Sequence, residues 1–186
     1  MKRKEKELLR LHLGLATEMR LNPDAQKPGF KLVDHSKDAD IRFDLLKFPW
    51  PLETETVAEV ISVGYLCFIP AKLRSLFMDE MWRVMQVGTK ATIIVPYWSS
   101  MRSVQDYLYE WPPWCESSFC YFDKQWRKAN RLEWRGLKCD FELGPYGYTA
   151  DAETSGRADD ARQFWVKHYL NSASDLNMTL TKRKAE

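Results

Sequence analysis

Two segments, Val57-Ala-Glu-Val-Ile-Ser-Val63 and Lys90-Ala-Thr-Ile-Ile-Val-Pro96, decide the fold class of this chain together with the residues between them. Both are short apolar runs of strand length, and Pro96 ends the second one. Pro70 suits the first turn of a helix, because a proline has no N–H that would lack a partner there. Apolar residues at helical spacing then predict a helix over residues 71–86 that ends before Gly88; they are Leu73, Phe77, Met81, Val84 and Met85. A strand, a helix and a strand in this order form a βαβ unit with parallel strands.

Further strands are predicted upstream of this unit. Apolar runs of strand length occupy residues 8–13, 30–33 and 39–43, and each run is followed by Gly or Asp. Strands that alternate with a clear helix are typical of an α/β domain. We therefore expect these three strands to join one sheet with the strands of the βαβ unit.

The downstream third of the chain has a different pattern. Apolar residues alternate with polar ones in residues 137–143, 164–170 and 176–180, which predicts antiparallel strands. We expect residues 171–174 to form a hairpin loop between the last two strands. The polar residues 151–160 are predicted to be an exposed loop.

The composition is that of a globular protein. The chain has 186 residues, of which 45% are hydrophobic and 29% charged, and we expect a single domain over residues 1–186. The formal net charge of +2 is small for a dedicated nucleic-acid binder. The basic ends, residues 1–7 and 182–186, are therefore predicted to be solvated tails that attract nucleic acid only weakly.

The compartment is predicted from what the sequence lacks. It has no run of about 18 apolar residues and no signal region, so we expect a cytoplasmic protein without a membrane span. The four cysteines have neither the spacing of a zinc site nor the density of a disulfide scaffold. We interpret them as reduced thiols; they are Cys67, Cys115, Cys120 and Cys139.

Residues 98–130 are rich in aromatic side chains and contain the pair Pro112-Pro113. We expect a cap of helices and loops over this range. Two interpretations stay open: the aromatic residues form a core under a long connection, or they stack on nucleobases or form an apolar pocket.

Two aspartates follow predicted strands at positions where open α/β sheets bind ligands. Asp34 ends the second strand and is placed to accept hydrogen bonds from two ribose hydroxyls, because an ionised carboxylate only accepts. Asp44 ends the third strand and is placed to accept from an adenine amino group. The alternative for each is a structural role, in which the side chain caps a turn.

The chain resembles the class I S-adenosylmethionine-dependent methyltransferases in a set of segments that occur in the family's order. They are Leu11-His-Leu-Gly14, Gly29-Phe-Lys-Leu-Val-Asp34, Ala39-Asp-Ile-Arg-Phe-Asp44, Val57-Ala-Glu-Val60, Leu66-Cys-Phe-Ile-Pro70 and Ala91-Thr-Ile-Ile-Val-Pro-Tyr97. The chain is most similar to the compact, often phage-encoded branch, whose members begin almost directly with the first strand. The resemblance implies a Rossmann-like sheet of central parallel strands in the order 3-2-1-4-5, with an antiparallel edge hairpin beyond the fifth.

The resemblance also implies S-adenosylmethionine as cofactor and a set of binding residues. These are His12, Gly14, Ala16, Asp34, Asp44, Tyr65 and Cys67. The family's glycine-rich loop corresponds to Gly14, Leu15 and Ala16, which keep one glycine, and His12 stands where relatives have Asp or Asn. Cys67 and Phe68 replace a Glu-His pair, so we expect a more apolar pocket in which Phe68 takes part of the space of the methionine moiety.

The sequence thus predicts methyl transfer from S-adenosylmethionine to an acceptor that it does not identify. It indicates no catalytic residue and no metal site, since neither His35 nor His168 has a ligand partner at suitable spacing. The alternative is an inactive protein of methyltransferase fold that acts as a binding or regulatory partner, for example of a paralogue or a second copy. A third hypothesis is an aromatic-rich module that binds nucleic acid.

Overall fold

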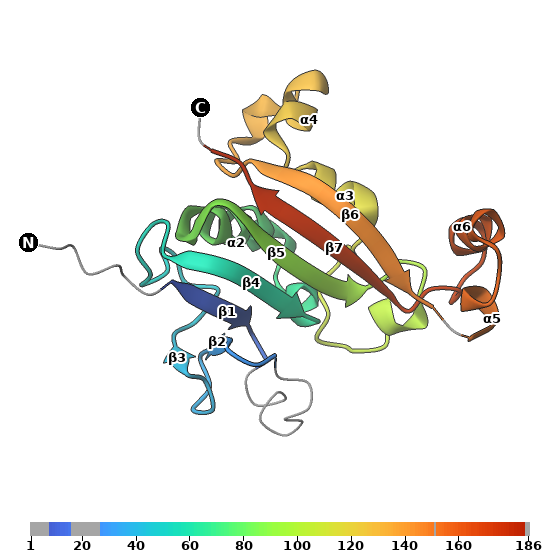
Figure 1. Ribbon diagram of the computed structural model, residues 1–186, viewed down its shortest axis with the longest axis horizontal. Helices are drawn as coiled ribbons and strands as arrows, with labels where there is room; N and C mark the ends of the chain where they lie inside the picture. The colour runs from blue at the N-terminus through green and yellow to red at the C-terminus, as the bar shows by residue number, and fades with distance from the viewer. Residues whose placement is uncertain (1–7, 16–26, 151, 185–186) are drawn as a thin grey trace, which may run out of the picture.

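A computed structural model describes residues 8–15, 27–150 and 152–184, and these form one seven-stranded sheet of order β3-β2-β1-β4-β5-β7-β6. The strands are β1 (Leu9–Leu13), β2 (Lys31–Asp34), β3 (Ile41–Arg42), β4 (Val57–Val63), β5 (Met85–Pro96), β6 (Phe141–Thr149) and β7 (Asp175–Lys182). The first five are parallel, whereas β7 is antiparallel to both β5 and β6 (Figure 1). The predicted order of the parallel strands and the antiparallel edge are confirmed.

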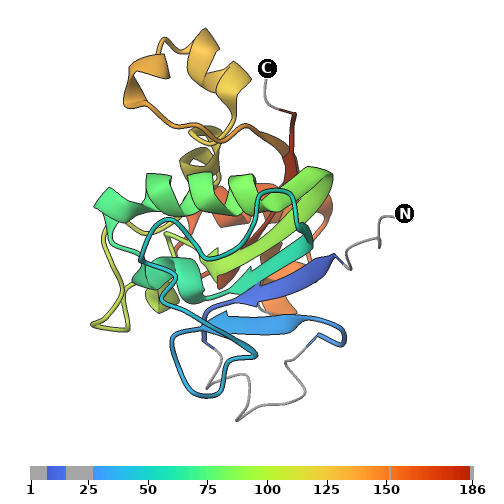
Figure 2. The same ribbon diagram turned by 90° about the vertical axis from the view of Figure 1, so that its left-hand side faces the viewer.

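The helix α2 (Ala71–Val84) covers one face of this sheet (Figure 2). It begins directly after Pro70, as predicted, and turns a row of large apolar side chains to the sheet. That row is Phe77, Met78, Met81 and Val84, all fully buried. On β5, Ala91, Ile93 and Val95 are buried in the same core cluster, whereas the alternating Thr92 and Ile94 are only half-buried. The core therefore lies between α2 and one face of the strands.

The boundary between helix and fifth strand differs from the prediction. The helix ends at Val84 and β5 begins at Met85, within the residues predicted to be helical. Gly88 has φ 80° and lies inside the strand, where the register with β4 shifts. The glycine therefore belongs to an irregularity in β5 and does not separate a helix from a strand.

The prediction was wrong for residues 164–170. They lie mostly in α6 (Asp159–His168), and the predicted loop at residues 151–160 contains α5 (Ala152–Ser155). The partner of β7 is β6, so residues 171–174 connect α6 to β7 and are no hairpin loop. The alternating pattern of 164–170 misled because α6 buries little of its surface: Val166 is its one buried residue.

Three smaller boundaries also differ. Residues 137–140 precede β6 and dock on α2, where Asp79 Oδ1 accepts from the N–H groups of Lys138 and Cys139 at 3.0 and 2.9 Å. The third strand is only Ile41–Arg42. Lys182, predicted to lie in a solvated tail, is the last residue of β7 and 3% exposed.

The aromatic cap over residues 98–130 contains one 3₁₀ turn and two short helices, and it is partly core. They are η3 (Met101–Ser103), α3 (Glu116–Cys120) and α4 (Lys124–Ala129); a second 3₁₀ turn, η4 (Glu133–Arg135), follows the cap. Trp114, Phe119 and Phe122 are buried in the main core, whereas Tyr107 and Trp111 are exposed. Packing thus explains only part of the aromatic content. The four cysteines are free thiols, and no described helix is long and apolar enough to span a membrane.

Candidate functional site

Gly14, Asp34, Asp44 and Tyr65 gather at the carboxyl ends of neighbouring strands. The N–H of Gly14 donates to Val33 O at 2.8 Å, which places the glycine beside Asp34. Tyr65 begins the 3₁₀ turn η2 (Tyr65–Phe68) after β4, and its ring packs on Gly14. The charges of Asp34 and Asp44 both act on the Tyr65 hydroxyl. Four of the seven residues that the sequence indicated are therefore brought together.

Both aspartates cap turns, as the structural alternative predicted. Asp34 Oδ1 accepts from the N–H of Ser36 at 3.1 Å and lies 2.9 Å from His35 Nδ1. Asp44 Oδ1 accepts from the N–H of Leu46 at 2.9 Å. A carboxylate has about four acceptor positions, so one side chain can cap a turn and also contact a ligand. The two roles are compatible.

The ring of Tyr65 occupies the space next to Gly14. Burial, and then the charges of Asp34 and Asp44, raise the pKa of Tyr65 well above its ordinary value, so its hydroxyl stays protonated. Gly14 has φ 77°, and a Cβ at this position would overlap ring carbons of Tyr65. The glycine thus allows the aromatic ring to approach the backbone at the end of β1.

The side chain of Leu15 also lies near the ends of β1 and β4. It has φ 57°, a conformation that costs a residue with a Cβ about 1–2 kcal/mol. Its Cδ1 lies 3.5 Å from the position that a Cβ would take on Gly64, the residue before η2. Leu15 and Tyr65 therefore fill part of the space between the ends of β1 and β4.

His12 is a buried polar side chain that lacks partners. It is 2% exposed, and neither ring nitrogen has a hydrogen-bond partner among the residues that the structure describes. It pairs with Leu32 and Ile61 on the neighbouring strands, which places its side chain on the sheet face opposite to Leu11 and Leu13. Burial lowers the pKa of His12, so the imidazole is neutral at pH 7.

Cys67 and Phe68 lie towards the cap. Cys67 is buried, its charged neighbours are Arg74, Arg102 and Asp175, and burial raises the pKa of its thiol to about 12. Phe68 packs edge-on against Tyr109 at 5.0 Å between ring centroids. Neither contact involves Asp34 or Gly14, so these residues are not brought to the group around Tyr65. Ala16 lies outside the described residues.

The structure contains one polar cluster that the sequence did not indicate. The hydroxyls of Tyr97 and Tyr148 both donate to Glu116 Oε1, the first at 3.1 Å. Burial raises the pKa of Tyr97 to about 12, and both tyrosines remain donors at neutral pH. Tyr97 directly follows β5, Glu116 begins α3 and Tyr148 lies in β6. No local sequence pattern could therefore have indicated the cluster. Among the described residues, no group of His, Cys, Asp and Glu has the arrangement of a metal site.

The strand order and the parallel core define a fold class, the Rossmann-like fold of the class I methyltransferases, and solved structures support it. An S-adenosylmethionine-dependent methyltransferase from Archaeoglobus fulgidus has a TM-score of 0.62 at 12% identity, over 95% of this chain and 87% of that chain. One from Mesorhizobium loti has a TM-score of 0.51 at 12% identity, over 95% and 91%. A chain of the complex that contains the Haloferax volcanii Trm112 methyltransferase activator has a TM-score of 0.57 at 15% identity, over 100% and 86%. No family model and no curated protein matches the sequence.

Proposed function

We propose that the chain binds S-adenosylmethionine at the carboxyl ends of β1, β2 and β3 and transfers its methyl group to an acceptor that is not identified. One observation carries the proposal: Asp34 is the last residue of β2, Asp44 lies two residues beyond the adjacent strand β3, and both act on Tyr65, in a sheet with the methyltransferase strand order. These are the carboxylates that the sequence assigned to the ribose and the adenine.

The residues present fit such a ligand in three respects. The side chain of Asp34 is 8% exposed, and its ionised carboxylate only accepts hydrogen bonds, as a partner of two ribose hydroxyls must. Asp44 is more exposed, at 36%, and suits an amino group that enters from solvent. His12 is an orphaned polar group two residues before Gly14, and a polar ligand atom that reached its imidazole would satisfy it.

The chemistry needs little from the protein beyond position. The cofactor supplies an activated methyl group on a sulfonium, so an aligned nucleophile is sufficient for transfer. The described residues would orient the ligand and exclude water. We assign no catalytic residue.

A specific observation favours the alternative, an inactive binding protein of the same fold. Tyr65 packs on Gly14 and Leu15 reaches Gly64, so both side chains take space where the strand ends would be open to a ligand. In this alternative the unmutated protein does not bind the cofactor. Binding should then arise in the double variant Leu15→Gly/Tyr65→Ala, which removes both side chains.

Equilibrium dialysis with radiolabelled S-adenosylmethionine tests the proposed site. Asp34→Asn keeps an oxygen that accepts from the Ser36 N–H but loses the negative charge, so we expect the ligand-free fold to be unchanged and binding to weaken about tenfold or more. Asp106→Asn is a matched control, because Asp106 Oδ1 caps the same kind of turn by accepting from Leu108 N–H at 2.9 Å. Equal weakening by both variants would contradict the assignment.

A further inference from the structure

A separate cavity of about 560 Å³ lies between the first turns of α2 and residues 112–137. Its volume is in the range of sites for small ligands, about 300–1,000 Å³. We name it the α2–η4 pocket; its lining includes Lys72, Arg74, Trp114, Tyr121, Trp134 and Arg135. None of the residues grouped around Tyr65 lines it, so it is distinct from the candidate cofactor site.

Arg74, which lines the α2–η4 pocket, makes several contacts with its surroundings. Arg74 stacks on Trp114, with its guanidinium carbon 4.5 Å from the ring centroid. Its guanidinium also donates to the carbonyl oxygens of Ile69, Glu110 and Pro112 at 3.1, 2.8 and 2.7 Å. These contacts fix a cation and an aromatic ring in one place before any ligand arrives.

The outer wall of the pocket also combines an arginine with aromatic rings, and here these groups are exposed. Arg135 lies over Tyr121 at 4.6 Å and over Trp134 at 5.3 Å from the ring centroids. Trp134 is 77% exposed, which is unusual for the largest apolar side chain. Its ring is thus open to a flat partner beside a positive charge.

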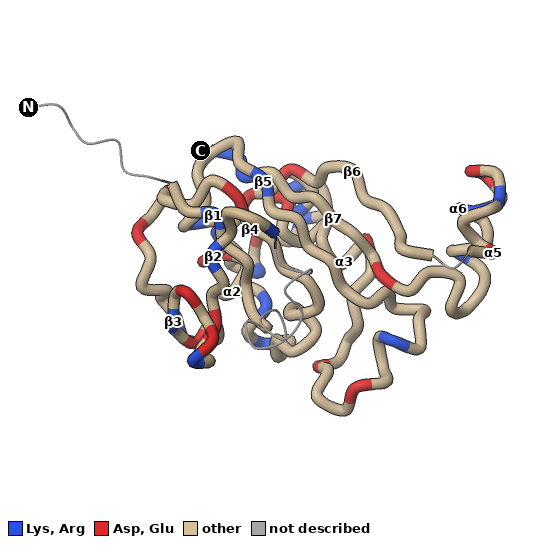
Figure 3. Tube along the Cα trace, turned by 60° about the horizontal axis from the view of Figure 1, so that its bottom comes forward, with Lys and Arg blue, Asp and Glu red and all other residues tan. Residues whose placement is uncertain are grey.

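The charge around the pocket is strongly one-sided. Residues 124–138 contain six Lys or Arg, of which Arg127 alone is buried, and one acidic residue, Glu133, whereas the whole chain has a net charge of only +2. No Asp or Glu is among the residues that line the α2–η4 pocket. Acidic positions gather instead around β3, at the far edge of the sheet (Figure 3). The small net charge therefore conceals a basic surface.

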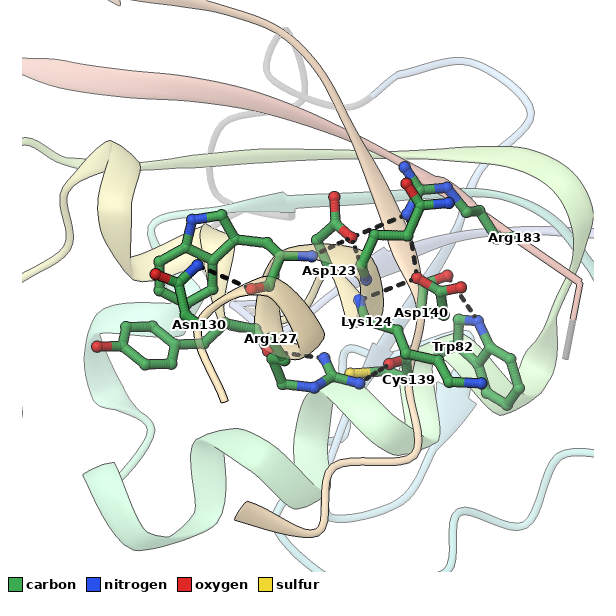
Figure 4. A network of polar contacts seen from close by, with 11 residues as sticks. Trp82, Asp123, Lys124, Arg127, Asn130, Cys139, Asp140 and Arg183 are labelled. Atoms are coloured by element: carbon green, nitrogen blue, oxygen red, sulfur yellow. Dashed lines mark hydrogen bonds and ion pairs between the residues drawn. The ribbon is translucent and has the colours of Figure 1, made fainter. Parts of the chain in front are cut away.

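A polar network holds this basic segment to the sheet (Figure 4). Asp140 Oδ1 accepts from the N–H of Lys124 at 3.0 Å and from Arg183 Nη1 at 3.2 Å. Arg127, the buried residue of α4, donates to Cys139 O at 2.8 Å. Because α4 is fixed in this way, the wall formed by η4 keeps its position relative to α2.

We propose that the α2–η4 pocket binds single-stranded nucleic acid, with an unpaired base stacked on Trp134 and phosphate groups near Lys72 and Arg135. Exposed aromatic rings accept the face of any base, and flanking cations neutralise the phosphates. A duplex keeps its bases stacked inside, so it would not offer a base to this wall. This binding does not depend on methyl transfer.

Fluorescence anisotropy with labelled oligouridylate and oligothymidylate of ten nucleotides tests the proposal on the full chain at low salt. Trp134→Ala should weaken binding about five- to a hundredfold, the range for the loss of one stacked base. Lys72→Ala should weaken it and reduce the slope of log K against log salt by about one.

Trp111→Ala is the matched control, because Trp111 is 75% exposed and does not line the α2–η4 pocket. It should bind as tightly as the unmutated protein. The absence of binding at low salt would overturn the proposal, and so would equal losses from Trp111→Ala and Trp134→Ala. A mononucleotide or poly-glutamate that competes as well as the oligomers would also overturn it, in favour of a free nucleotide or of non-specific charge. Thermal melting of each variant checks that it is folded.

Discussion

We expect the substitution His12→Leu to stabilise the ligand-free protein. The imidazole is 2% exposed, and both of its nitrogens lack hydrogen-bond partners. A buried polar group without a partner costs about 1–3 kcal/mol, and leucine has a similar size without that cost. In a protein of this length, each kcal/mol corresponds to about 2–4 °C in Tm. The variant should therefore melt a few degrees higher at pH 7.5.

The same substitution should remove a pH dependence. Burial lowers the pKa of His12 below its ordinary value of 6.5, so below that pH the unfolded chain binds a proton that the folded chain excludes. The stability of the folded protein therefore has its full value above pH 6.5 and falls with the pH below it, by at most about 1.4 kcal/mol per pH unit. The advantage of His12→Leu over the unmutated protein should thus grow between pH 7.5 and pH 5.5.

Thermal melting at several pH values measures both effects. His168→Leu makes the same change at an exposed position of α6 and should alter neither Tm nor its pH dependence to the same extent. A lower Tm for His12→Leu at pH 7.5, with no change in the pH profile, would refute the reasoning. It would mean that the imidazole has partners in the ligand-free protein.

Two further substitution pairs test other contacts by urea unfolding. Gly14→Ala should destabilise the protein more than Gly88→Ala. Both glycines have positive φ, 77° and 80°, but only a Cβ on residue 14 would meet the ring of Tyr65. Equal losses of stability in the two variants would show that the ring moves freely. Lys182→Ala should lower the free energy of unfolding by about 2–3 kcal/mol, and Lys184→Ala should hardly change it. Of the two lysines, Lys182 is buried, and its amine donates to a backbone carbonyl oxygen at 2.7 Å. A small loss of stability in both variants would contradict the burial of Lys182.

The parallel half of the fold could be predicted because each strand has its own local signals. The first strand ends at a glycine, the second at an aspartate, and the helix after the fourth begins after a proline. The order of the strands came from the family resemblance and not from these signals. No local signal tells which strands are neighbours.

The C-terminal half was harder to predict for a physical reason. In α6, Phe164 is 55% exposed and stacks on His168 at 4.2 Å between ring centroids, so its apolar residues do not mark a buried face. Spacing by two residues then resembles a strand. Patterns of hydrophobicity predict an element only where burial follows the pattern.

The candidate site shows the same division. Asp34 was predicted at the end of a strand and is the last residue of β2, whereas Asp44, predicted to end the third strand, lies two residues beyond β3. The contact of Tyr65 with Gly14, and the left-handed conformation of Leu15, depend on how two distant strand ends meet. The α2–η4 pocket likewise joins segments about 40–60 residues apart, and periodicity along the chain carries no information on such contacts.

Isothermal titration of the unmutated protein with S-adenosylhomocysteine tests the central claim most directly. This compound is the cofactor without its transferable methyl group, so it contains the ribose and adenine that Asp34 and Asp44 would hold but has no methyl group to transfer. We predict saturable one-to-one binding with a dissociation constant between about 1 µM and a few hundred µM, a free energy of about −5 to −8 kcal/mol. The absence of binding at about 1 mM ligand, with binding restored in Leu15→Gly/Tyr65→Ala, would contradict the claim and show that the fold has closed its cofactor site.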